Sequence, residues 1–184
     1  MITSIIALDQ TIVTALYAIR DPRLVDVFTW ITKLGEVTIV FAFTAVVVII
    51  LSYRKQWVPV AGIIVSVLGS TAATYVLKEL VARPRPSIGI LTYAETTPSF
   101  PSTHAALAIA FYGFILFLVW NTLSPVQQKI KFAAILMIIL AVGFSRLYLG
   151  VHYLSDVLVG YLVGAVFFWL GVVVSRKFSL SKSS

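Results

Sequence analysis

Both histidines of this chain stand in short polar motifs within an otherwise apolar sequence. His104 ends a Pro-Ser-Thr-His motif, and Asp156 follows His152 four residues later. Residues four apart share one face of a helix, so the Asp156 carboxylate can fix the tautomer of His152 and leave its other nitrogen able to attack. His104 is placed to protonate a leaving oxygen. A helical His/Asp pair can equally be a structural hydrogen bond, so this pair alone does not indicate catalysis.

Basic residues accompany the histidines without a matching set of carboxylates. Lys78 and Arg85 flank the end of one apolar segment, and Arg146 lies near the end of another. Converging cations need an anion, and a phosphoryl group suits the fork of arginine and the point charge of lysine. Ser102 stands in the position of a helix N-cap, so backbone N–H groups around Thr103 add an anion cradle. The alternative is that each basic side chain only reaches from a helix end to water.

The composition indicates a membrane protein. Of the 184 residues, 60% are hydrophobic and 11% are charged, with a mean hydropathy of +1.01, whereas a soluble domain has roughly 45–50% apolar residues. The net charge of +7 is spread over short loops and motifs, which disfavours nucleic acid as a partner. The absence of cysteine excludes disulfides and thiolate-bound zinc. Two histidines without a dense carboxylate cluster predict no metal and no cofactor.

The apolar segments predict an all-α integral membrane bundle of about five or six transmembrane helices, forming one domain over residues 1–184. Residues 4–19 have apolar groups at helical spacing but are short for a span, which favours a helix at the interface. A second short helix over 24–33 completes an N-terminal interfacial region, 1–36. The helical core, 37–174, has predicted spans at 37–53, 58–81, 102–120, about 130–149 and about 152–174.

The connections between these spans predict the orientation. Polar loops are expected at 87–101 and at 121–131, with Ser124-Pro125 as a helix start in the second, and a break at Gly150. Alternate threading places every motif on one membrane face together with all seven acidic residues. Short loops rich in Lys and Arg stay cytoplasmic, so the motif face is expected to be exoplasmic. The opposite face receives Arg54, Lys55, Lys129, Lys131, Arg176, Lys177 and Lys182.

Three motifs together resemble the signatures of the type 2 phosphatidic acid phosphatase superfamily of membrane lipid phosphatases. They are Lys78 followed after six intervening residues by Arg85-Pro86, Pro-Ser-x-His ending at His104, and Ser-Arg at Arg146 followed by His152 and Asp156. The match spans the central and C-terminal helices in the family's order. Thr103 stands where the family commonly has glycine.

The resemblance implies a role for each of these residues. His152 would be the nucleophile that forms a phosphohistidine, Asp156 its orienting partner and His104 the general acid. Water would then hydrolyse the phosphoenzyme, with no metal required. The phosphate oxygens would be held by Lys78, Arg85, Ser102, Arg146 and the backbone around Thr103.

The expected substrate is a lipid phosphate at the headgroup level. The first expectation, partly from the resemblance, is a bacterial polyprenyl (undecaprenyl) diphosphate phosphatase in the cytoplasmic membrane with its site facing the periplasmic side. Phosphatidate or phosphatidylglycerophosphate phosphatase is the alternative within this class. The alternatives from other functional classes are a lipid phosphotransferase and a non-catalytic membrane protein that binds lipid phosphate. Membrane lipids are the expected surroundings, and the oligomeric state is left open.

Overall fold

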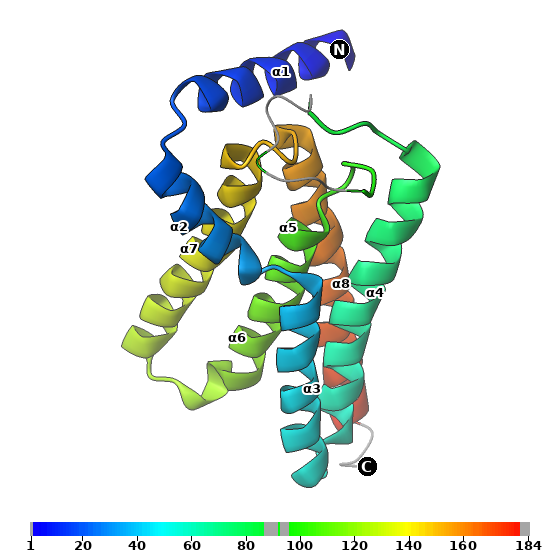
Figure 1. Cartoon of the computed structure of the whole chain (residues 1–184). Coiled ribbons are helices and arrows are strands. Elements are labelled where there is room, and N and C mark those ends of the chain that lie inside the picture. Colours follow the sequence, from blue (N-terminus) through cyan, green and yellow to red (C-terminus); the bar gives the residue numbers. More distant parts are fainter. Residues whose placement is uncertain (1, 87–91, 93–95, 181–184) are drawn as a thin grey trace.

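The computed structural model describes residues 2–86, 92 and 96–180, and the regular elements in this part of the chain are all helical. The predicted all-α architecture is therefore confirmed. In chain order (Figure 1) the elements are α1 (Ile2–Ala18), α2 (Pro22–Lys33), α3 (Val37–Tyr53), α4 (Trp57–Val81), α5 (Thr103–Leu107), the π-helix η1 (Ala108–Gly113), α6 (Phe114–Val119), the short 3-10 helix η2 (Trp120–Thr122), α7 (Pro125–Tyr148) and α8 (Leu154–Leu180).

Five helical stretches of the described chain are long and apolar enough to cross a membrane. Because a span needs about 20 apolar residues, α1 is too short to be one of them. It lies across the end of the bundle at which α4 ends and α8 begins (Figure 1). The five stretches are Pro22–Tyr53, Trp57–Val81, Thr103–Thr122, Pro125–Tyr148 and Leu154–Arg176. This protein is an integral membrane protein, and the interfacial placement of residues 1–36 stays a prediction.

The predicted helix start at Ser124-Pro125 is confirmed, whereas the fourth span was expected to begin only at about residue 130. The predicted loop over 121–131 is therefore too long, because α7 already begins at Pro125. Ser124 and Gln127 form a reciprocal capping box, which supplies partners for backbone N–H groups that a helix start otherwise leaves unpaired. The polar residues after Pro125 therefore belong to the first turns of the helix. The predicted break at Gly150 is confirmed, since its φ of 70° is a left-handed conformation that suits glycine.

Helices α4 and α8 pack closely against each other. Small residues let the backbones of the two helices approach closely, and a Cβ added at Gly62 would lie 2.7 Å from the Gly171 carbonyl oxygen. The main apolar cluster sits beside this seam and joins α3, α4 and the third span. Its buried members are Val40, Ile63, Val67, Leu107, Phe111 and Phe114.

The third span contains the π-helix η1, which sequence patterning does not reveal. A π-turn displaces the usual pairing of backbone groups, and such turns often lie close to functional sites. Ser66 of α4 donates its hydroxyl to the Ala110 carbonyl oxygen at 2.8 Å, so a buried polar group from the neighbouring helix accompanies the irregular turn. The π-helix begins at Ala108, about one helical turn after His104 along the same span.

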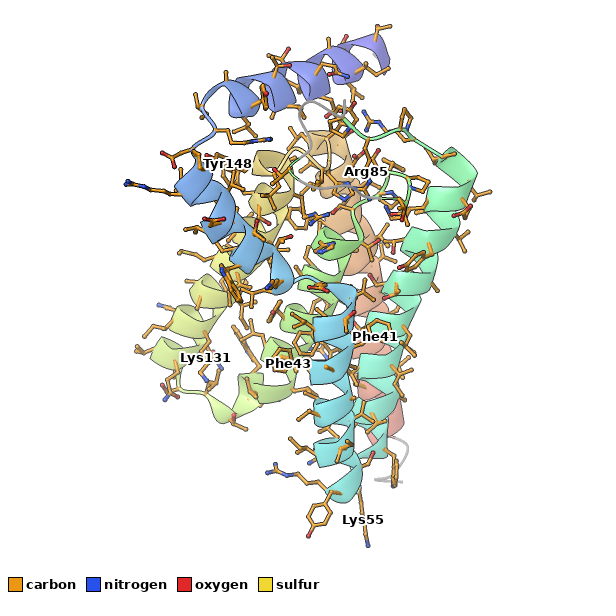
Figure 2. The ribbon with its side chains drawn as sticks, viewed as in Figure 1. Phe41, Phe43, Lys55, Arg85, Lys131 and Tyr148 are labelled. Carbon is orange, nitrogen blue, oxygen red and sulfur yellow. The ribbon has the colours of Figure 1, made fainter. Side chains whose placement is uncertain are left out.

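The two ends of the bundle differ as predicted. Lys55 and Lys131 lie at the end opposite to Arg85 (Figure 2), in agreement with the alternate threading of the spans. Of the residues used for the orientation, Glu95 and Lys182 lie outside the described part, as does most of the first half of the 87–101 loop.

Candidate active site

The motifs converge on a single small cavity of about 150 Å³. At about 30 Å³ per water molecule, such a space holds a few waters or one phosphate group, but not a lipid tail. Six of the eight predicted site residues line it, namely Lys78, Arg85, Thr103, His104, Arg146 and His152. Asp156 and Ser102 do not. A larger cavity of about 730 Å³ lies near Trp120 and Arg176, but it has no histidine or carboxylate in its lining.

Asp156 stands behind His152, where an orienting partner is expected. The His152 Nδ1 lies 3.5 Å from Asp156 Oδ2, which also accepts the Tyr153 N–H at 3.0 Å. The other carboxylate oxygen, Oδ1, accepts from Arg83 Nη1 at 2.6 Å. Both side chains are almost completely buried, with 2% and 0% of His152 and Asp156 exposed. This geometry directs the Nε2 of His152 away from Asp156 and towards the cavity.

The surroundings of His152 keep its imidazole neutral. Burial lowers the pKa of His152 well below its usual value, and the positive charges of Arg146, Arg85 and Lys78 lower it further, against a hydrogen bond to the Ser99 backbone. The Nε2 lies 3.3 Å from Arg85 Nη1. A neutral imidazole with one nitrogen turned to a carboxylate and the other to an anion site has the form of a nucleophile or a base.

The three predicted cations are held by neutral oxygen atoms of neighbouring segments. Arg146 Nη1 donates to the Thr32 hydroxyl of α2 at 2.9 Å, and Lys78 donates to the Pro98 carbonyl. Arg85 donates to the carbonyl oxygens of Thr97 and Val151, each at 2.8 Å. These contacts fix the direction of each charge before a substrate arrives, which is the preorganisation that phosphoryl transfer needs.

Ser102 and Thr103 occupy different places at the start of the third span. Ser102 is the N-cap of α5, and its backbone N–H donates to the Asp156 carbonyl oxygen at 3.0 Å. It is fully buried behind the cavity. Thr103 begins the helix and lines the cavity. Among the described residues only Lys55 and Ala82 have a positive φ without being glycine, so Thr103 is accommodated without left-handed backbone.

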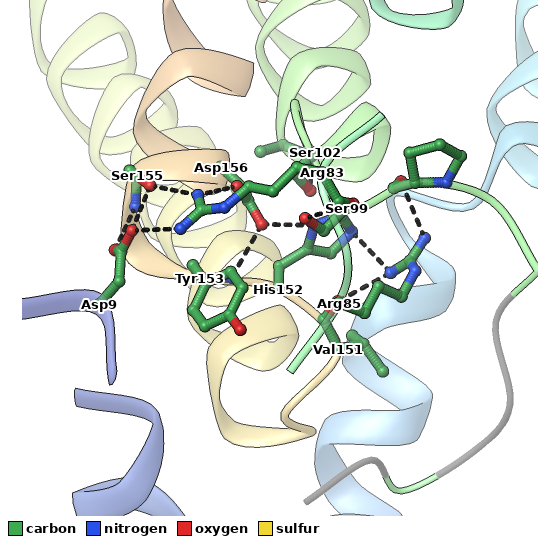
Figure 3. Close-up of polar contacts among 12 residues, drawn as sticks. Asp9, Arg83, Arg85, Ser99, Ser102, Val151, His152, Tyr153, Ser155 and Asp156 are labelled. Atoms are coloured by element: carbon green, nitrogen blue, oxygen red, sulfur yellow. Dashed lines mark hydrogen bonds and ion pairs between the residues drawn. The ribbon is translucent and has the colours of Figure 1, made fainter. Parts of the chain in front are cut away.

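The sequence did not reveal Arg83 and Asp9 as part of this region. Figure 3 shows Arg83 between two carboxylates, with its Nη2 at 2.8 Å from Asp9 Oδ2 and its Nη1 at 2.6 Å from Asp156 Oδ1. Neither residue is among the site residues that the three motifs predict. A charged residue within an apolar helix is itself the signal that could have identified Asp9. Thr32, Thr97 and Ser99 give no comparable signal.

The described residues contain no group of three or more histidine, aspartate or glutamate side chains placed to hold a metal ion. The site as described therefore offers two imidazoles, one buried carboxylate and a set of fixed cations around a space of phosphate size. This arrangement can bind a phosphate group, attack it with an imidazole nitrogen and protonate the group that leaves.

Comparisons with known proteins agree with this chemistry. The family model of the PAP2 superfamily matches residues 59–179. Phosphatidylglycerophosphatase B of Bacillus subtilis is 35% identical over 169 residues, which cover 88% of this chain and 80% of that protein. The crystal structure of a transmembrane PAP2 type phosphatidylglycerolphosphate phosphatase from Bacillus subtilis superimposes with a TM-score of 0.86 at 30% identity, covering 95% of this chain and 87% of that one. Dolichyldiphosphatase of Saccharomyces cerevisiae is 30% identical over 110 residues, which are 53% of this chain and 46% of that protein.

Proposed function

This chain belongs to the PAP2 superfamily and is a membrane lipid phosphatase, and we propose that it hydrolyses the phosphomonoester of phosphatidylglycerophosphate through a phosphohistidine on His152. On sequence alone a polyprenyl diphosphate was the first expectation. The relatives favour the alternative, because phosphatidylglycerophosphatase B matches over most of both chains. The observation that carries the proposed mechanism is the shared cavity of His104, His152 and the three cations.

In the first step, the phosphate of the lipid occupies the cavity between Lys78, Arg85 and Arg146. The Nε2 of His152 attacks phosphorus, the bond between phosphorus and the lipid oxygen breaks, and its electron pair leaves with that oxygen. His104 donates a proton to the leaving oxygen. The negative charge of the bound phosphate favours the protonated form of His104. The fixed cations stabilise the charge on the transferring group.

In the second step, a water molecule replaces the departed alcohol. His104, now neutral, accepts a proton from this water as its oxygen attacks phosphorus. The bond between phosphorus and Nε2 breaks, and its electron pair returns to the imidazole of His152. Asp156 stabilises the proton on Nδ1 during both steps, in the way that the carboxylate of a hydrolytic triad does. Inorganic phosphate and the lipid alcohol are the products.

The proposed location is a bacterial cytoplasmic membrane, with the site at its exoplasmic face. The support is the distribution of charge, since the end of the bundle that carries Lys55 and Lys131 lies opposite to Arg85 (Figure 2). A cysteine introduced at Lys55, which is exposed, should react with a membrane-impermeant maleimide only after the membrane is opened. Reaction in intact cells would reverse the assignment.

The substrate is tested by phosphate release from the purified protein in detergent. Phosphatidylglycerophosphate, phosphatidate and a polyprenyl diphosphate are compared at equal mole fraction, with and without a chelator. We expect the highest kcat/KM on phosphatidylglycerophosphate and no effect of the chelator. Faster release from the polyprenyl diphosphate would reverse the order of the two substrates, and transfer of label to an alcohol instead of water would indicate a phosphotransferase.

A polyprenyl diphosphate remains the second candidate substrate. The similarity to a dolichyldiphosphatase supports it, although this chain spans less than half of that relative. A terminal phosphate of a diphosphate presents the same oxygens to Lys78, Arg85 and Arg146 as a monoester does. The lining of the cavity alone therefore does not separate the two lipids, and the comparison of phosphate release does.

A further inference from the structure

We propose that Asp9 of α1 is a positioning residue for the catalytic pair of His152 and Asp156, on which it acts through Arg83 and Ser155. The inference rests on the proposed function of this pair. Asp9 stands out within its own helix, because most side chains of α1 are exposed whereas only 2% of Asp9 is exposed. A buried carboxylate has a high desolvation cost unless it is paired, so its partners identify what holds it there.

The first partner of Asp9 is the beginning of α8. Its Oδ1 accepts the Ser155 backbone N–H at 3.0 Å, and its Oδ2 accepts the Ser155 hydroxyl at 2.5 Å. The first N–H groups of a helix have no partner within the helix, and a carboxylate there also favours the positive end of the helix dipole. Asp9 thus caps α8 from a different helix, one residue before Asp156.

The second partner is Arg83, which connects Asp9 to the catalytic carboxylate. One guanidinium joins both acids, with Nη2 at 2.8 Å from Asp9 Oδ2 and Nη1 at 2.6 Å from Asp156 Oδ1 (Figure 3). The guanidinium also stacks on the ring of Tyr153, 4.2 Å from its centroid. Gln10, next to Asp9, donates to the Tyr153 hydroxyl at 3.2 Å. α1 therefore holds the segment between His152 and Asp156 by two adjacent side chains.

This arrangement leaves the Asp156 carboxylate only one orientation. Oδ1 is held by Arg83, and Oδ2 accepts the Tyr153 N–H while facing the Nδ1 of His152. Without Asp9, Arg83 loses one of its two acidic partners and the start of α8 loses its cap. The orienting oxygen is then less well fixed relative to the imidazole. Asp9 has no place in the lining of the phosphate cavity, so substrate binding should be largely independent of it.

The test is a comparison of Asp9→Asn with the wild type on phosphatidylglycerophosphate. Loss of the residue that supports a metal-bound histidine commonly costs 10-fold to 100-fold in affinity or activity, and Asp9 supports a catalytic histidine in a comparable way, so we expect kcat to fall by about 10-fold or more, with KM within about twofold. Asp9→Glu keeps the charge and should restore part of the loss. The control is Asp26→Asn, the same chemical change at an exposed position of α2, which should leave kcat unchanged.

A double-mutant cycle separates positioning from general stabilisation. If Asp9 acts through Arg83, the combination of Asp9→Asn with Arg83→Gln should lower kcat by much less than the product of the two single effects. An additive loss would overturn the inference. So would an Asp9→Asn protein with wild-type kcat, or one in which only Tm falls.

The outcome also distinguishes this inference from the proposed function. A wild-type protein that releases phosphate from none of the lipids contradicts the proposed function. A wild-type protein that is active, together with an equally active Asp9→Asn, contradicts the inference alone. If Asp9→Asn does not yield folded protein, the cycle is run with Asp9→Glu and Arg83→Lys, where coupled losses in kcat are expected and independent ones overturn the inference.

Discussion

Arg83 and Arg85 are separated by a single proline, yet they lie on opposite sides of His152 (Figure 3). Arg83 pairs with the carboxylates of Asp9 and Asp156 on the side of Nδ1. Arg85 lines the phosphate cavity on the side of Nε2, where its Nη1 lies 3.3 Å from that nitrogen. The same residue type therefore serves the two nitrogens of one imidazole in different ways.

The difference lies in what each guanidinium can offer to a substrate. Arg83 has its charge matched by two carboxylates within the protein, so it holds the protein's own groups in place. Arg85 is directed into the cavity by carbonyl oxygens of two loops, where its charge can meet a phosphate. A cation next to a nucleophile is thus not evidence of substrate binding until its partners are known. This comparison predicts separable effects on kcat and on substrate binding.

The largest effect is expected at the imidazole between the two arginines. His152→Ala removes the proposed nucleophile, and the loss of a nucleophile typically lowers kcat by several orders of magnitude. We expect phosphate release to fall at least about 1,000-fold, with loss of any acid-labile phosphoenzyme in a rapid-quench experiment. A His152→Ala protein with near wild-type turnover would remove the basis for the comparison.

Arg85→Gln should have the next largest effect, on the substrate side. Removing one fixed donor to a transferring group commonly costs about 100-fold to 1,000-fold, and part of this loss should appear in KM. Inhibition by inorganic phosphate should weaken in parallel, because the same cavity binds the product. Unchanged inhibition by phosphate would place Arg85 outside the binding site.

Arg83→Gln should have a smaller effect, of a different kind. It removes the link between Asp9 and Asp156, so we expect kcat to fall by about 10-fold to 100-fold, with little change in KM or in inhibition by phosphate. Arg83→Lys should restore only part of the activity, because a single ammonium cannot replace two arms of a guanidinium. If phosphate inhibition weakens as much as in Arg85→Gln, the two arginines do not have distinct functions.

The spans, and the six motif residues that line the cavity, could be identified from the sequence because both depend on local features. Helix length follows from apolar runs, and the motif residues lie at the ends of the spans that alternate threading brings to one side. The helix start at Ser124-Pro125 was predicted, but the span itself was expected to begin later because the capping box at Ser124 extends the helix into polar sequence. The π-helix η1 was missed because it depends on packing against α4, where Ser66 meets the Ala110 carbonyl oxygen.

The network behind His152 could not be predicted for a different reason. Asp9 and Asp156 are joined by Arg83, and these residues come from three segments far apart in the chain. No regular spacing in the sequence relates these three residues, and the pattern of the helix that carries Asp9 predicts a helix at the membrane interface. Arg83 and Arg85 also look alike in the sequence, since each precedes a proline. Only their side-chain directions distinguish them.

The smallest effect concerns pH, and it separates the two arginines by the position of the pH profile instead of by the size of the rate loss. The neutral form of His152 attacks, so kcat/KM falls as pH decreases through its pKa. Burial and the charges of Arg146, Arg85 and Lys78 hold the pKa of His152 well below its usual value, so in the wild type this fall should occur below about pH 6.5.

Arg85→Gln removes one of these charges, which raises the pKa of His152 and moves the fall in kcat/KM towards neutral pH. Arg83 is not among the main charges that lower the pKa of His152, so Arg83→Gln should move the profile less than Arg85→Gln does. All three proteins are measured on the same substrate, so the titration of the lipid phosphate affects their kcat/KM profiles equally and does not contribute to the differences between them. Equal displacement of both variants would show that Arg83 and Arg85 act on the imidazole in the same way.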